Sequence, residues 1–129
     1  MTNKQLTRLG KQWQHLLRLD DWHIKYEMVC KGDIGGAVGR CSTKDSYKIA
    51  EIAIANDFCY EPHDDMRELE ETLVHELLEI HYTPFKYDWK KGTRHLYDAQ
   101  ERSLNMISMA MVALKYTKRG GQRGRRGKK

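Results

Sequence analysis

The first segment of the chain repeats apolar residues at the spacing of one face of a helix. The residues on this face are Leu6, Leu9, Trp13, Leu16 and Leu17. Thr2 and Gln5 have the spacing of a capping box, in which each side chain accepts a hydrogen bond from the other residue's backbone N–H. The pattern therefore predicts a helix from about Asn3 to Leu19.

A period of two replaces the helical period after Asp21, as is typical of a half-buried strand. The alternating apolar residues are Trp22, Ile24, Tyr26 and Met28. This strand is expected to end near Cys30, where a glycine-rich turn over residues 32–36 begins. Two further strands are predicted over residues 37–43 and 47–55. In the last strand the expected core residues are Ala50, Ile52 and Ile54.

Two helices are predicted in the second half of the chain. The first follows a loop over residues 56–65, begins after Asp64 or Asp65, and ends near His81 or Tyr82, before Thr83-Pro84. After a second loop, a long amphipathic helix is expected from Thr93 to Tyr116. Its expected buried stripe is Leu96, Ala99, Leu104, Ile107, Met111 and Leu114. Separate runs of strands and helices favour an α+β fold with a small, largely antiparallel three-stranded sheet.

Length and charge divide the chain into one domain and a tail. With 129 residues, 40% of them hydrophobic, the chain is long enough for a single core. Its formal net charge of +5 comes from the C-terminal end, since residues 117–129 contain basic residues and no acid. The basic residues are Lys118, Arg119, Arg123, Arg125, Arg126, Lys128 and Lys129. We therefore expect a domain over residues 1–116 and a disordered basic tail that contacts nucleic acid without sequence preference.

The distribution of apolar residues and the number of cysteines indicate where in the cell the protein is expected. No run of apolar residues is long enough for a membrane span, and the first residues lack the apolar stretch of a secretory signal. The prediction is a soluble, cytoplasmic protein without a membrane partner. Cys30, Cys41 and Cys59 are odd in number and form no CxxC, so they are expected to be reduced.

Candidate chemistry is concentrated in the predicted helix over residues 70–81. His75 and Glu79 are four residues apart, or about 40° around a helix, so both side chains can point at one metal ion. Glu76 leans toward the same cleft, and Leu73, Leu77 and Ile80 are left to anchor the opposite side in the core. Metal-assisted hydrolysis needs such a set, in which side chains hold the ion and a separate carboxylate takes a proton from water.

This helix resembles the one that carries His-Glu-x-x-His in the zincin metallopeptidases. The order of segments over residues 20–114 is also similar to the small phage-type and SprT-like metallopeptidases. The similar features are a strand that opens Asp-Trp-x-Ile, a glycine-rich hairpin, a strand like AEIAIA, the run Thr-Leu-Val-His-Glu-Leu-Leu, and a closing helix with a glutamate. The resemblance implies a zincin-like minimal domain, zinc as cofactor and a protein or peptide substrate.

The sequence departs from the zincin pattern at Glu79, which stands where the motif has its second histidine. A carboxylate is an acceptable zinc donor, so Glu79 remains a candidate ligand, although manganese, iron or no metal is also compatible with it. His81 is a possible substitute, but it lies roughly 120° away from His75 around the helix.

In the gluzincin branch of the resembled family, the third ligand is a glutamate on the following helix. Glu101 is the best match, and Asp98 and His95 are the substitutes. The resemblance thus implies a metallopeptidase in which His75 and Glu101 hold the metal and Glu76 is the general base. Glu79 stands at a position that does not match the motif and is the further candidate ligand.

Two other hypotheses stay open at this point. In the first, the site has degenerated at Glu79, and the chain is a noncatalytic zincin-like module that binds nucleic acid through residues 118–129. In the second, Glu76, Glu79, Asp98 and Glu101 form a two-metal carboxylate site, although the usual Glu-x-x-His pairs of such sites are absent.

Overall fold

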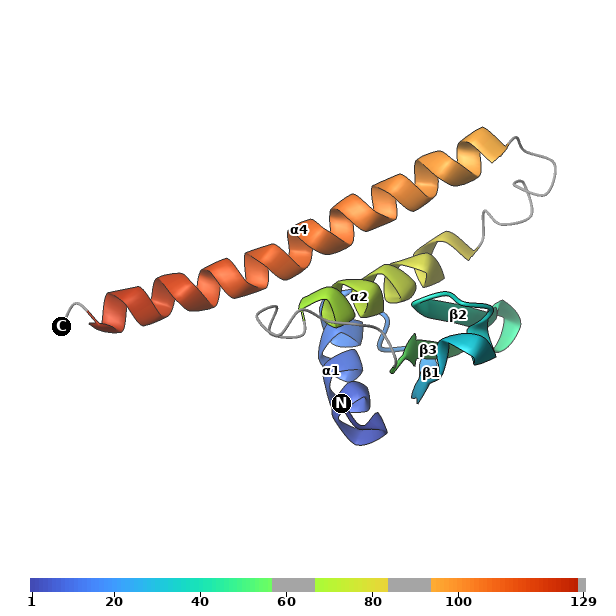
Figure 1. Ribbon diagram of the computed structural model, residues 1–129, viewed down its shortest axis with the longest axis horizontal. Helices are drawn as coiled ribbons and strands as arrows, with labels where there is room; N and C mark the ends of the chain where they lie inside the picture. Colours follow the sequence, from blue (N-terminus) through green and yellow to red (C-terminus); the bar gives the residue numbers. More distant parts are fainter. Residues whose placement is uncertain (57–66, 84–93, 128–129) are drawn as a thin grey trace.

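The computed structural model describes residues 1–56, 67–83 and 94–127, apart from the side chains of His95 and residues 118–127. The main elements are α1 (Asn3–Leu16), β1 (His23–Val29), β2 (Gly39–Lys44), β3 (Ile49–Ala55), α2 (Arg67–Tyr82) and α4 (Arg94–Gly127). Figure 1 shows α1 and the sheet on one side of α2 and the long α4 lying across the other. This is the small α+β fold that the sequence predicts.

Helix α1 begins with the predicted capping box between Thr2 and Gln5. It ends at Leu16, three residues earlier than expected. The reason is local, because Arg18 adopts a left-handed conformation with φ of 62° and the N–H of Leu19 bonds the carbonyl of Gln14. A residue in this conformation turns the chain back, so that N–H groups beyond the helix bond to its last carbonyl groups.

The sheet has the strand order β1-β3-β2 and is mixed. Strand β3 pairs antiparallel with β2 and parallel with β1, so the expectation of a largely antiparallel sheet is only half met. The central position suits β3 because it is the most apolar strand, and its Ala50, Ile52 and Ile54 are buried as predicted. As a result, β2 is left at one edge.

The turns beside β2 contain two short 3₁₀ helices, η1 (Lys31–Ile34) and η2 (Asp45–Tyr47). After η1, Gly35 and Gly36 both have positive φ, a conformation that favours glycine. The chain then reaches the start of β2 beside α2. At Gly39 an added Cβ would lie 2.7 Å from Cγ2 of Thr72. This close approach places the start of β2 against the helix that carries the candidate site.

Helix α2 is buried along one side, as the sequence predicts. The predicted Leu73, Leu77 and Ile80 are each at most 2% exposed, and Leu69, which was not predicted, is buried with them. They pack into a single core with residues of α1, the sheet and α4. The helix ends at Tyr82, where the predicted stop before Pro84 is confirmed.

Helix α4 packs on α2 through a face that only partly overlaps the predicted stripe, since Leu104 is buried as expected and Met111 packs against the core. Its buried residues are Leu104, Ser108 and Val112, whereas Ile107 is 40% and Leu114 is 72% exposed. The expected Leu96 and Ala99 are also exposed, and Met111 is partly buried. Polar contacts from α2 explain the rotation. Lys115 and Tyr116 donate hydrogen bonds to Glu70, and Glu101 pairs with His75.

The backbone of α4 continues to Gly127, whereas the sequence predicts a helix end near Tyr116 and disorder over 117–129. The backbone N–H and C=O groups of a helix bond to one another within the helix, so the helical backbone can continue past the residues that pack on α2. Figure 1 shows this extension running past the rest of the molecule.

The predicted loops over residues 56–65 and 84–92, and the cap at Asp64 or Asp65, lie outside the described residues except for Asn56. Within the described part, none of the helices has the length and apolar character needed to cross a membrane.

Candidate metal centre

Helix α2 presents its polar face to α4 and to the start of β2. His75 and Glu79 are one turn apart on this face, with Glu76 beside them. Their apolar neighbours hold the opposite face in the core, which fixes the direction in which the polar side chains project. The hydroxyl of Thr72 on the same face donates a hydrogen bond to the carbonyl of Glu68.

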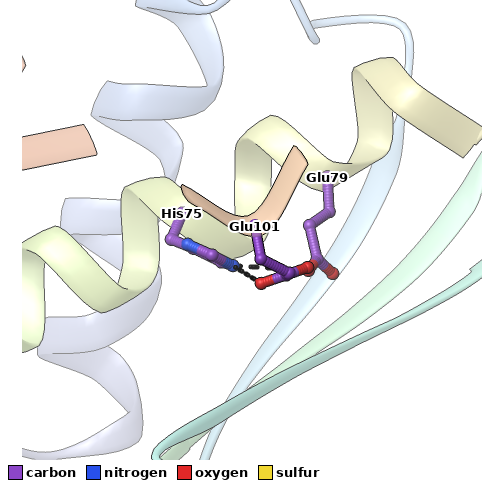
Figure 2. A group of neighbouring side chains, drawn as sticks. All are labelled: His75, Glu79 and Glu101. Carbon is purple, nitrogen blue, oxygen red and sulfur yellow. Dashed lines mark ion pairs between the residues drawn. The ribbon is translucent and has the colours of Figure 1, made fainter. Parts of the chain in front are cut away.

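The structure brings the three predicted ligands together. Nε2 of His75 lies 3.1 Å from Oε2 of Glu101 and 3.4 Å from Oε1 of Glu79. One candidate ligand atom from each residue falls within 4.8 Å of the other two. Figure 2 shows the imidazole edge and the two carboxylates meeting at one point, with Glu101 reaching across from α4.

These distances fit a bound metal ion. In a tetrahedral site with bonds of about 2.1 Å, neighbouring ligand atoms are about 3.4 Å apart. The separations of His75 from Glu79 and from Glu101 are close to that value. The side chains are 12% exposed for His75, 17% for Glu79 and 27% for Glu101, so the position is shielded but still partly accessible. The set therefore provides three protein donors and a place for a fourth ligand.

The electrostatics of the cluster favour a positive charge. Burial opposes protonation of His75, but the surrounding Glu79, Glu76 and Glu101 outweigh it and raise its pKa to about 9. The imidazole therefore carries a proton at neutral pH when no metal is bound. A metal ion would replace that proton and neutralise the same carboxylates, because only the neutral imidazole is a ligand.

Glu76 is the most buried acid of the site, at 7% exposed. Burial, reinforced by Glu79 and Glu101, raises its pKa to about 8, although His75 opposes this shift. Its side chain lies against the start of β2, where Cγ and Oε1 would each be 3.2 Å from a Cβ added at Gly39. Glycine at position 39 thus leaves room for the carboxylate.

A cleft of about 620 Å³ borders the site, and Glu79, the third candidate ligand, is not among its lining residues. Its walls are the start of β2, the polar face of α2 and the neighbouring face of α4. The residues that line it include His75, Glu76 and Glu101. Ligand atoms, a buried carboxylate and space for a substrate therefore occur together in one cleft.

Among the described side chains, two of the alternative ligands, His81 and Asp98, are not part of this cluster. His81 instead bonds the carbonyl of Leu17 through Nε2 at 2.8 Å, which ties the end of α2 to the end of α1. Asp98 is exposed and is not in the group that could hold a metal. The side chain of His95 lies outside the described part of the structure, as do the seven basic side chains from Lys118 onward.

Sequence reasoning missed two features near the site. Tyr97 lies one turn before Glu101, and that carboxylate is the main cause of its raised pKa, so it lies within electrostatic reach of the cluster. The sequence could have indicated this proximity, because residues four apart on a helix lie on the same face. Glu70, only 2% exposed, accepts hydrogen bonds from Trp13, Lys115 and Tyr116. From the sequence, Glu70 could be interpreted only as an acid near the start of a helix, where its negative charge interacts favourably with the helix dipole.

Comparisons with known proteins leave the resemblance to the zincins as a hypothesis. The chain matches no protein-family model, no curated protein and no solved structure. The geometry of the site is therefore the basis on which a function can be proposed.

Proposed function

We propose that this protein is a metal-dependent hydrolase, and specifically a zincin-like metallopeptidase. The observation that carries the proposal is the convergence of His75, Glu79 and Glu101 from two helices, with the buried Glu76 beside them. Three donors with an open fourth position are typical of catalytic rather than structural zinc sites. A separate carboxylate in the same cleft supplies the acid–base group that hydrolysis needs.

Each residue has a distinct role in this mechanism. His75, Glu79 and Glu101 would hold the metal, which when bound supplies a Lewis acid and lowers the pKa of water. Glu76 takes the proton of the attacking water and returns it to the leaving amine.

The position of β2 supports a peptide as substrate. This strand is at the edge of the sheet, and Gly39 at its start lines the cleft together with Ala37 and Val38. An extended peptide can add to such an edge through main-chain hydrogen bonds. That arrangement would carry a peptide bond past Glu76.

Zinc is the metal that we propose, although the donor set also suits other divalent ions. One imidazole and two carboxylates form a harder set than two imidazoles and one carboxylate, so manganese and iron are the main competitors. The two carboxylates also lower the net charge of the site, which reduces its power to acidify water.

Substitution of Glu76 tests the proposed mechanism. Glu76→Gln keeps the size of the side chain but removes the proton acceptor, so we expect hydrolysis of a casein or mixed-peptide substrate to fall by about 10²–10⁴-fold. Metal content and thermal stability should remain near those of the wild type. Glu27→Gln, which changes an exposed acid of β1, is the control and should leave the rate unchanged. Full activity of Glu76→Gln would contradict the mechanism.

A further inference from the structure

Three helices meet at the carboxylate of Glu70, which is only 2% exposed. Trp13 of α1 donates a hydrogen bond of 2.7 Å from Nε1 to Oε1 of this carboxylate. From α4, Lys115 donates to the same oxygen, and the hydroxyl of Tyr116 donates to Oε2 at 2.7 Å. Moving any of these partners away would leave a buried charge without it, which is costly. Glu70 therefore fixes where α1 and α4 lie on α2.

The two partners on α4 restrict the rotation of that helix. Lys115 and Tyr116 are neighbours in the sequence, so their side chains leave the helix about 100° apart. Both reach Glu70 in the orientation of α4 that the structure has. Arg67 of α2 adds a further contact, because its guanidinium lies 5.0 Å from the centre of the Tyr116 ring. A rotation of α4 by one residue position would move at least one of the two partners away from the carboxylate.

The apolar residues of α4 do not by themselves require this rotation. Leu104 and Val112 are buried against the core. Ile107 and Leu114 stay exposed on another face of the helix. Packing that other face on α2 would also remove apolar area from water, so the hydrophobic effect alone does not choose between the two faces. The bonds to Glu70 supply the choice.

The same rotation places Glu101 at the metal centre. Glu101 lies 14 residues before Lys115, which is about 21 Å along a helix axis and about 40° around it. Both residues are on one continuous helix, and Oε2 of Glu101 lies 3.1 Å from Nε2 of His75. A turn of α4 by one residue position would carry Glu101 about 100° away from this direction. The bonds to Glu70 and the position of Glu101 therefore depend on the same setting of α4.

We propose that Glu70 is a positioning residue of the metal centre. Through Lys115 and Tyr116 it sets the rotation of α4, and α4 carries Glu101 to the ion that His75 and Glu79 hold. Glu70 itself does not line the cleft beside the site. The inference rests on the proposed function, because the ion is the one that the proposed hydrolase binds.

Metal affinity measures this role without catalysis. Glu70→Gln removes the charge that holds Lys115, so α4 is free to rotate and Glu101 is no longer fixed at the ion. Loss of a residue that orients a ligand typically costs about 10–100-fold in metal affinity, and we expect zinc binding by the full chain to weaken by a similar factor. Competition with a chromophoric chelator gives the affinity, and circular dichroism shows whether each variant is folded.

A double-variant cycle with Glu101→Ala separates positioning from other effects of the substitution. Once Glu101 is no longer a ligand, the rotation of α4 has no consequence for the ion. Adding Glu70→Gln to Glu101→Ala should therefore change zinc affinity by less than about threefold. A direct effect of the lost charge on the ion would instead lower the affinity by the same factor in both backgrounds. That result, or equal affinity of wild type and Glu70→Gln, would overturn the inference.

A neutral variant on α4 repeats the test without a change of charge. Tyr116→Phe removes one donor to Glu70, so it should also weaken zinc binding, and only when Glu101 is present. This variant carries the cycle if Glu70→Gln does not fold. Unchanged zinc affinity in Tyr116→Phe, together with a loss in Glu70→Gln that persists without Glu101, would overturn the inference.

A core variant on α1 is the control for lower stability. Leu6→Ala opens a cavity at a fully buried position and destabilises the fold without removing a partner of Glu70. The folded variant should bind zinc as the wild type does. A loss of affinity equal to that of Glu70→Gln would show that reduced stability is the cause, and would overturn the positioning role.

The same proteins separate this inference from the proposed function. If zinc binding weakens in Glu70→Gln only when Glu101 is present, but the wild type hydrolyses no peptide, the hydrolase is contradicted and the positioning role is supported. If the wild type hydrolyses peptides and Glu70→Gln binds zinc equally well, the hydrolase is supported and the positioning role is overturned. A wild type that binds no metal ion would contradict both.

Discussion

At the scale of single residues, Glu79 determines what kind of centre the chain can form. It occupies the position where the zincin helix has a second histidine, and its carboxylate lies 3.4 Å from the imidazole of His75. If Glu79 is a ligand, the site is complete without that histidine. If it is not, the cluster is an ion pair between a protonated histidine and its acidic neighbours.

Restoring the histidine separates these two cases. Glu79→His exchanges one zinc donor for another, so we expect zinc affinity to change by no more than about tenfold. A degenerate site would instead gain a missing ligand and bind zinc far more tightly than the wild type. Competition with a chromophoric chelator measures the affinity, and an increase of more than about a hundredfold would contradict the role of Glu79 as a ligand.

The candidate ligands differ in how far the sequence could predict them. The spacing of His75 and Glu79 indicates a shared helix face, because helical geometry is local. Glu101 could be chosen over other acids only through the resemblance to the gluzincins, since its pairing with His75 depends on how two distant helices pack. The raised pKa of Glu76 depends on burial, which the sequence does not give.

At the scale of elements, polar contacts determine which face of α4 meets α2. Two apolar stripes compete on this helix, and the one with more large hydrophobic residues is the one that stays exposed. The buried face instead brings Lys115 and Tyr116 to Glu70, and Glu101 to His75. Hydrophobic periodicity could not predict this choice, because a charge buried without partners costs more than an exposed leucine or isoleucine.

Glu70 is therefore expected to stabilise the packing of α4. Glu70→Gln removes the charge that accepts hydrogen bonds from Trp13, Lys115 and Tyr116, and should lower the free energy of unfolding by about 2–4 kcal/mol. Urea denaturation measures the change. Glu27→Gln, an exposed control, should stay within about 0.5 kcal/mol of the wild type.

The same variant has a defined pH dependence. Burial alone would raise the pKa of Glu70, but the bonds from Lys115, Trp13 and Tyr116 outweigh it and lower the pKa below the ordinary 4.5. The stabilisation is then fully present above pH 4.5 and is lost as the pH falls through the folded-state value. The stability difference between wild type and Glu70→Gln should shrink in acid, and a constant difference would contradict this account.

The contact between β2 and α2 predicts a second structural effect. In Gly39→Ala the new Cβ would lie 2.7 Å from Cγ2 of Thr72 and 3.2 Å from the Glu76 side chain, so strand and helix must move apart. We expect a loss of about 1–3 kcal/mol in stability and a lower rate of hydrolysis.

Thr72→Ser supplies the matched rescue for Gly39→Ala. It removes the Cγ2 methyl that the new Cβ meets and keeps the hydroxyl that bonds the carbonyl of Glu68. The double variant should regain part of the stability in urea denaturation. Equal stability of wild type and Gly39→Ala would show that the close approach has no energetic consequence.

At the scale of the whole molecule, the order of elements was predictable and their assembly was not. Periodicity gave α1, the three strands, α2 and the start of α4, because each pattern reflects local burial. The mixed sheet was missed because β3, not β2, is adjacent to β1, and strand order depends on long-range packing. The basic segment from Lys118 onward remains a proposed nucleic-acid contact, since its side chains lie outside the described part.

Metal content is the measurement that tests the central claim most directly. Elemental analysis of protein purified without a histidine tag should find about one zinc, manganese or iron ion per chain in the wild type and none in His75→Ala. His81→Ala is the control and should retain the metal, because its ring bonds the Leu17 carbonyl. No metal in the wild type, and none taken up when zinc is added, would contradict the account.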